Sequence, residues 1–94
     1  MTEQTASMEA IRRIERMEQI FDTLLVAFQT NPSAIFNDSA LHALLNELTQ
    51  YYDGGQWLRD YELDEQGKLP AGLKRGVLAQ DAVYDFLTLV SSIR

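Results

Sequence analysis

All five glycines of this 94-residue chain lie in one window, between Gly54 and Gly76. The same window holds the only tryptophan, Trp57, and one of the two prolines, Pro70. Glycine and proline interrupt helices, whereas the sequence on both sides of the window has helical periodicity. We therefore expect a long irregular segment over residues 53–79, set between helices, and we expect any specific role of the protein to lie there.

This segment has its own apolar side chains, which favour an ordered conformation over a disordered one. They are Trp57, Leu58, Tyr61, Leu63, Leu69 and Leu73. Long connections without regular structure are uncommon in compact domains and tend to be functional or flexible. Since the apolar residues can anchor the chain, we expect an ordered excursion from the helical core, in which Gln56 to Tyr61 can form a short helical turn.

Apolar residues recur at intervals of three and four along the first third of the chain, which is the spacing of one helix face. This stripe consists of Ile11, Ile14, Met17, Phe21, Leu24, Leu25 and Phe28. It predicts a first helix over about residues 7–29, which ends before Asn31 and Pro32 because proline disfavours a helical residue before it. Two interpretations remain open: the stripe packs on the domain's own core, or it forms a seam between two copies.

The same spacing predicts two further helices. Leu41, Leu44, Leu45, Leu48 and Tyr52 indicate a second helix over about 39–52, and Val83, Phe86, Leu87 and Val90 indicate a third over about 80–93. We expect the cap of the third helix at Ala79. No alternating strand pattern is present, so the predicted fold is all-α. The first two helices form an antiparallel hairpin, the third helix packs on it, and residues 1–94 form a single domain.

Charge and hydropathy argue against several classes of partner. The net charge is −6, which repels the phosphate backbone of nucleic acids. The three clustered arginines Arg12, Arg13 and Arg16 are interleaved with Glu9, Glu15 and Glu18. The longest strictly apolar run, residues 24–28, is far shorter than the roughly 20 residues of a membrane span. We therefore expect a cytoplasmic protein that binds neither nucleic acid nor a membrane.

No catalytic, metal or cofactor constellation is present. The chain lacks cysteine, and its single histidine, His42, is too little for a structural zinc site. No serine lies in a Gly-x-Ser-x-Gly turn, and the pair Gly54 and Gly55 lacks the third glycine of a dinucleotide loop. An acidic stretch starting at Glu62 resembles a calcium loop, but Leu73 occupies the twelfth position, where calcium needs glutamate. We expect no enzyme, no cofactor and no metal.

The charges of the window are mixed, which predicts internal ion pairs. Arg75 is suited to pair with Asp60 or with Asp64, because a guanidinium group matches the two oxygens of a carboxylate. Five residues form the candidate interaction surface: Trp57, Asp60, Tyr61, Asp64 and Arg75. Aromatic rings near arginine are frequent anchors of protein interfaces, although they also fill small cores. We favour the core for Trp57 and Tyr52, and the partner-facing surface for Tyr61 and Arg75.

Several segments of the chain resemble one known family. They are Ile14-Glu15-Arg16-Met17-Glu18, Tyr51-Tyr52-Asp53-Gly54, Trp57-Leu58, Asp60-Tyr61-Glu62, Asp64-Glu65, Gly67-Lys68-Leu69-Pro70, Leu73-Lys74-Arg75-Gly76-Val77-Leu78 and Asp81-Ala82-Val83-Tyr84-Asp85-Phe86-Leu87. The family is known only as domain of unknown function 4298 (DUF4298), and the resemblance covers roughly residues 14–87. It implies a small helical domain of bacteria with no established activity.

Two functional hypotheses follow from the sequence. The first is a non-catalytic protein-interaction module, with self-association through its first helix as one form of it. The alternative is a domain that binds a small ligand or an ion through the acidic and basic segment at residues 60–75.

Overall fold

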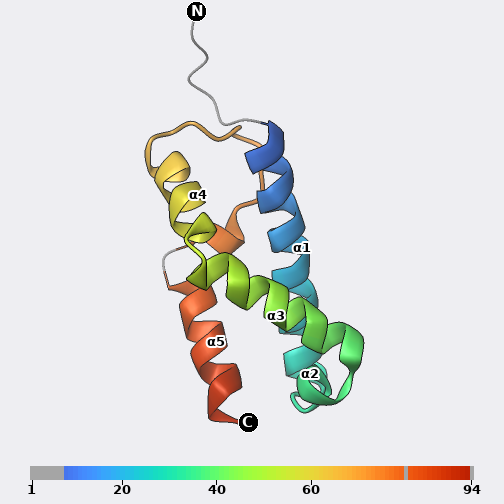
Figure 1. Cartoon of the computed structure of the whole chain (residues 1–94). Coiled ribbons are helices and arrows are strands. Elements are labelled where there is room, and N and C mark those ends of the chain that lie inside the picture. The colour runs from blue at the N-terminus through green and yellow to red at the C-terminus, as the bar shows by residue number, and fades with distance from the viewer. Residues whose placement is uncertain (1–7, 80, 94) are drawn as a thin grey trace, which may run out of the picture.

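The computed structural model describes residues 8–79 and 81–93. Its elements are α1 (Met8–Thr30), α2 (Ala34–Asn37), α3 (Ser39–Asp53), α4 (Gln56–Glu65), the 3-10 helix η1 (Gly76–Leu78) and α5 (Ala82–Ser92). The described residues contain no strand, so the prediction of an all-α fold is confirmed. Figure 1 shows α3 crossing α1 at a slant, with α4 and α5 at opposite ends of the molecule.

Helix α1 forms for the reason that the periodicity indicates. Ile14 and Leu24 are completely buried, and the stripe between them faces the interior. At its end the hydroxyl of Thr30 donates to the carbonyl of Val26 at 2.8 Å, two residues before Pro32. Because this stripe packs into the chain's own core, the structure supports the first of the two interpretations, in which the stripe packs within one copy.

The connection from α1 to α3 contains the short helix α2. Its residue Ile35 is fully buried and closes one end of the core. Asp38 then caps α3, because its Oδ1 accepts hydrogen bonds from the backbone nitrogens of Ala40 at 2.9 Å and Leu41 at 3.2 Å. An aspartate at this position satisfies amide groups that have no partner within the helix. Helix α3 then packs against both α1 and α4.

The prediction of one irregular segment over residues 53–79 is wrong, because ten of its residues form α4 and three form η1. Gly54 and Gly55 interrupt the helical path only briefly, with Gly55 in the left-handed region at a φ of 94°. No glycine or proline follows until Gly67, whose φ is 70°, so a helix can form between the two breaks. The main irregular stretch is therefore residues 66–75.

The start of the last helix also differs from the prediction. Helix α5 begins at Ala82, and Asp81 occupies the N-cap position with a left-handed φ of 73°. Ala79 has an extended backbone and accepts a hydrogen bond from the backbone nitrogen of Ala82 at 3.1 Å. The expected cap at Ala79 is therefore wrong. The predicted start at residue 80 lies outside the described residues.

The core joins α1, α3, η1 and α5. Its buried apolar side chains are Ile14, Met17, Ile20, Phe21, Leu24, Ile35, Leu45, Leu48, Tyr51, Leu69, Val77, Leu78, Val83, Phe86 and Val90. Phe86 of α5 meets the rings of Phe21 and Phe28 edge-on, with centroids 5.6 and 5.8 Å apart. Of the predicted anchors of the glycine-rich window, Leu69 is in this core and Trp57, Leu63 and Leu73 pack against it, whereas Leu58 is 52% exposed. The window is therefore held by part of the apolar set that the sequence indicates, and by Val77 and Leu78 directly after it.

The break between α3 and α4 gives a direct test of the backbone geometry. We expect Gly55→Ala to destabilise the protein by about 1–2 kcal/mol, because an L-residue resists the left-handed conformation. A Cβ at this position would meet nothing within 4 Å, so the cost is conformational and not steric. Gly72→Ala is the matched control, since Gly72 also has open space and has no positive φ. Urea denaturation of both variants measures the difference, and equal midpoints would contradict the assignment.

Candidate interaction surface

Asp60 does not belong to a surface, which corrects the sequence prediction for this residue. Its side chain is 0% exposed. One oxygen accepts a hydrogen bond from Arg13 Nη2 at 2.6 Å, and the other accepts from Arg13 Nε at 3.0 Å and from the Tyr51 hydroxyl at 2.7 Å. This carboxylate therefore connects α1, α3 and α4 inside the molecule.

The environment of Asp60 keeps its two partners, Tyr51 and Arg13, protonated, so that both donate hydrogen bonds. Burial, together with the hydrogen bond to Asp60, raises the pKa of Tyr51 far above the ordinary value of a tyrosine. The hydrogen bond to the same carboxylate raises the pKa of Arg13. A buried carboxylate with donors on both oxygens is a structural group whose lone pairs are already in use.

Asp64 and Arg75 form the second internal pair of the window. Arg75 Nη1 lies 2.6 Å from Asp64 Oδ1, and Arg75 Nη2 donates to the Pro70 carbonyl at 2.9 Å. The sequence left Asp60 and Asp64 as alternative partners for Arg75, and the structure pairs it with Asp64. This pair joins the end of α4 to the stretch over residues 66–75. The Asp64 carboxylate and the Arg75 guanidinium therefore hold that stretch against α4.

Glu18 is a structural residue that the sequence interpretation missed. It is only 9% exposed, and its Oε1 accepts a hydrogen bond from the backbone nitrogen of Val77 at 2.8 Å. The neighbouring Gly76 leaves room for this contact, because a Cβ there would lie 3.1 Å from Glu18 Oε2. Glu18 therefore fastens η1 to α1. Its position on the edge of the apolar stripe, next to Met17, was the only sequence signal of this role.

Four aromatic rings from three helices follow one another in space. The Tyr61 ring is stacked on Trp57 with centroids 5.0 Å apart and an interplanar angle of 15°. Trp57 lies 5.1 Å from Tyr52, which lies 6.5 Å from Tyr84. We call these four residues the aromatic row. The first three rings are half-buried and Tyr84 is 54% exposed. The row is therefore partly packed on the protein and partly accessible to solvent.

Trp57 has a fixed orientation within this row. Its Nε1 donates to the carbonyl of Val77 at 2.9 Å. Val77 is thus held on both sides, by Glu18 through its nitrogen and by Trp57 through its oxygen. The prediction of a core position for Trp57 is met in part, because one edge of the indole packs on the core while the residue stays half-buried.

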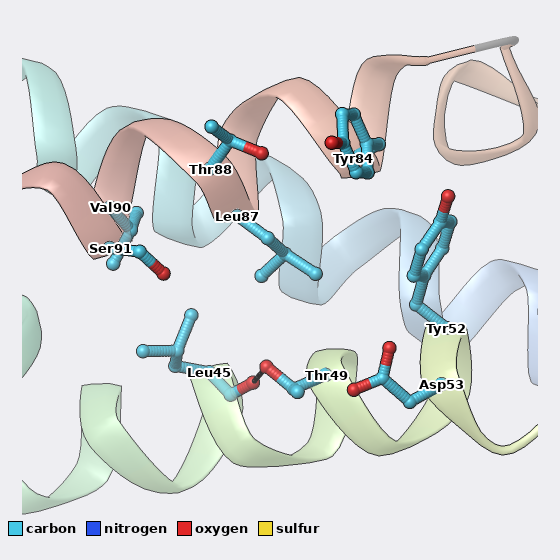
Figure 2. A pocket seen from close by; sticks show the side chains of 9 residues that line it. All are labelled: Leu45, Thr49, Tyr52, Asp53, Tyr84, Leu87, Thr88, Val90 and Ser91. Atoms are coloured by element: carbon cyan, nitrogen blue, oxygen red, sulfur yellow. Dashed lines mark hydrogen bonds between the residues drawn. The ribbon is translucent and has the colours of Figure 1, made fainter.

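The aromatic row ends in an open groove of about 420 Å³ between α3 and α5. Figure 2 shows its lining: Leu45, Thr49, Tyr52, Asp53, Tyr84, Leu87, Thr88, Val90 and Ser91. Leu45 and Val90 lie at one end, whereas Tyr52, Tyr84 and Asp53 lie at the other. We call this feature the α3–α5 groove.

The charges near the aromatic row and the α3–α5 groove are negative. Among the residues that the structure describes, Asp53 is the only charged one in the lining of the groove. The negative charge of Glu65, with further contributions from Asp64 and Asp81, raises the pKa of the Tyr61 hydroxyl. These carboxylates therefore lie near the far end of the aromatic row, and the row is acidic at both ends.

The arginines gather elsewhere. Arg12, Arg13, Arg16 and Arg59 line a separate hollow of about 580 Å³ together with Glu9, Met17, Glu47 and Gln56. Arg16 pairs with Glu47 through bonds of 2.8 and 2.9 Å. Glu15 and Glu18, which alternate with these arginines in the sequence, line a different hollow. Folding thus separates charges that appear interleaved along α1.

Comparison with known proteins identifies one family. A family model described as domain of unknown function (DUF4298) matches residues 14–93, a range that includes the aromatic row and the α3–α5 groove. No curated protein and no solved structure matches the chain. Within residues 8–79 and 81–93, no helix combines the length and the apolar character needed to cross a bilayer.

Proposed function

The chain belongs to the DUF4298 family, whose function is unknown, and we propose that it acts as a non-catalytic protein-interaction module. The observation that carries the proposal is the aromatic row that leads into the α3–α5 groove. Tyrosine and tryptophan dominate the binding energy of protein interfaces, and they do so most where a pocket lies beside them.

The proposal revises the candidate surface. Trp57 and Tyr61 stay in it, whereas Asp60 leaves because it is buried. Asp64 and Arg75 pair with each other, so their charged groups are engaged within the molecule. Tyr52 and Tyr84 join the surface, since their rings continue the row into the groove. Because Asp60, Asp64 and Arg75 are engaged internally, these three residues lend no support to the alternative of a small-ligand or ion site at residues 60–75.

The shape of the groove is suited to a helical segment of a partner. Its α3 side contributes residues at positions 45, 49, 52 and 53, and its α5 side contributes 84, 87, 88, 90 and 91, with intervals of three or four in 45/49/52, 84/87/91 and 84/88/91. These spacings of three and four extend over two turns of each helix. Apolar grooves between two helices commonly bind an amphipathic helix of another protein. Self-association through the α1 stripe is not part of the proposal, since that stripe is in the core.

A photo-reactive phenylalanine at position 84 tests the proposal in cells of the native host. We expect it to cross-link one defined protein, because Tyr84 is exposed at the mouth of the groove. The same residue at position 89 is the control: Leu89 lies on the same helix, is 50% exposed and does not line the groove. In binding assays with that purified protein, Tyr84→Ser should weaken affinity about tenfold or more, while Leu89→Ser should not.

Two results would contradict this function. One is the absence of a cross-link at position 84, and the other is equal capture of the same proteins from positions 84 and 89. The cytoplasmic location, the lack of catalysis and of nucleic-acid binding, and the hairpin arrangement within one domain belong to the same proposal and stay predictions from the sequence.

A further inference from the structure

We propose that the partner of the α3–α5 groove is an amphipathic helix whose apolar side chains enter the groove and whose lysine or arginine lies over the aromatic row. This inference rests on the proposed function and adds the chemistry of the partner. It commits to a positively charged segment of another protein.

The apolar part of the argument comes from the middle and the far end of the groove. Leu45, Leu87 and Val90 line it there and offer methyl groups to an incoming side chain. The hydroxyl of Thr49, which also lines the groove, already donates to the Leu45 carbonyl at 2.8 Å. Because this polar group is satisfied, an apolar side chain can enter the groove without breaking a hydrogen bond.

The charged part of the argument comes from the aromatic end. Asp53 lies there beside Tyr52 and Tyr84, and among residues 8–79 and 81–93 no basic residue lines the groove. Asp53, Glu65 and Asp81 form no ion pair within the same residues. These three carboxylates therefore have no ion-pair partner in the described part of the chain, whereas Asp64 is already matched by Arg75.

The tyrosine and tryptophan rings of the aromatic row also favour a cationic partner. A lysine or arginine over the face of a tyrosine is attracted by the quadrupole of the ring, and this attraction adds to that of nearby carboxylates. An acidic partner would meet unpaired carboxylates of its own sign, which disfavours binding. The net charge of −6 favours approach of a cationic segment from a distance as well. The arginine hollow shares no lining residue with the groove.

Three synthetic peptides test this chemistry on the full chain. Each has about 14 residues, or four helical turns, with the same leucine stripe. The remaining face carries lysine in the first peptide, glutamine in the second and glutamate in the third. Fluorescence of the single tryptophan, Trp57, reports binding because its ring belongs to the aromatic row. We expect the lysine peptide to bind about tenfold more tightly than the glutamine peptide, and the glutamate peptide to bind weakest.

Two substitutions locate the effect. Asp53→Asn should reduce the affinity for the lysine peptide several-fold and leave the glutamine peptide unchanged. Asp22→Asn removes the same charge from an exposed residue that lines a different hollow, and it should change neither affinity. The advantage of the lysine peptide should also shrink as salt is added, because ions screen exposed charges.

The possible outcomes separate this inference from the proposed function. Equal binding of the lysine and glutamine peptides would overturn the charge preference while leaving an apolar docking groove in place. Equal losses in Asp53→Asn and Asp22→Asn would overturn the location. If none of the three peptides binds, the inference is also wrong, and the cross-linking experiment at position 84 then decides the proposed function independently.

Discussion

Replacing Arg13 with methionine should destabilise the protein by about 2–4 kcal/mol. The substitution leaves the Asp60 carboxylate inside the molecule with only the Tyr51 hydroxyl as a donor. Removing one partner of a buried ion pair costs about 3–5 kcal/mol. We expect a somewhat smaller loss because the Arg13 side chain is 24% exposed, which lets water approach the pair. The free energy of unfolding in urea measures the effect.

Arg16→Met is the matched control for this substitution. Arg16 also lies on α1 and also binds a carboxylate through two bonds, but its partner Glu47 is on the surface. Water replaces a lost partner at such a site, so the variant should unfold at nearly the same urea concentration as the parent protein. Similar losses in the two variants would show that the burial of Asp60 does not decide its role.

Replacing Glu18 with alanine should destabilise the protein by about 1–3 kcal/mol, because it leaves the buried amide of Val77 without an acceptor. The same change should shift the emission of Trp57, since the indole of Trp57 is bound to the carbonyl of Val77. The two readouts together test whether η1, α1 and the aromatic row are coupled through one residue.

Two further variants isolate the hydrogen bond of Glu18. Glu15→Ala truncates an exposed glutamate on the same helix and should leave both stability and Trp57 emission near the parent values. Glu18→Gln keeps an oxygen acceptor and should recover most of the loss. If Glu18→Ala and Glu15→Ala behave alike, η1 is not held in place by Glu18.

The long helices were predictable because their evidence is local. The stripe that includes Ile14 and Leu24 has a helical period, and an amphipathic face that must be buried determines where the helix runs. Helix α4 was predicted only as a short turn over Gln56 to Tyr61, for a local reason too. Its sequence lies between Gly54 and Gly67, and the density of glycines favours irregular backbone around that turn. The glycines instead mark the two ends of a helix, with Gly55 and Gly67 in left-handed conformations.

The internal carboxylate contacts could not be predicted, because they join residues far apart in the chain. Asp60 binds Arg13 across 47 positions, and Glu18 binds Val77 across 59. Local spacing offers nearer acidic residues instead, such as Glu9, which lies four positions before Arg13. A charged residue in an acidic segment looks solvent-exposed until the fold shows which other residues surround it.

The candidate surface was predicted in part for the same reason. Trp57 and Tyr61 were identified because aromatic rings near arginine are frequent anchors of protein interfaces. Tyr84 was not identified, since its ring meets Tyr52 only when α5 is placed beside α3. The α3–α5 groove depends entirely on that placement.

An amide NMR map of the complex tests the central claim most directly, with the protein captured at position 84 added to the isotope-labelled chain. We predict that the changes concentrate on the residues of α3 and α5 that line the groove and on the indole of Trp57. Changes centred on the arginine hollow around Arg12 and Arg59, with the groove and the indole unaffected, would contradict the account.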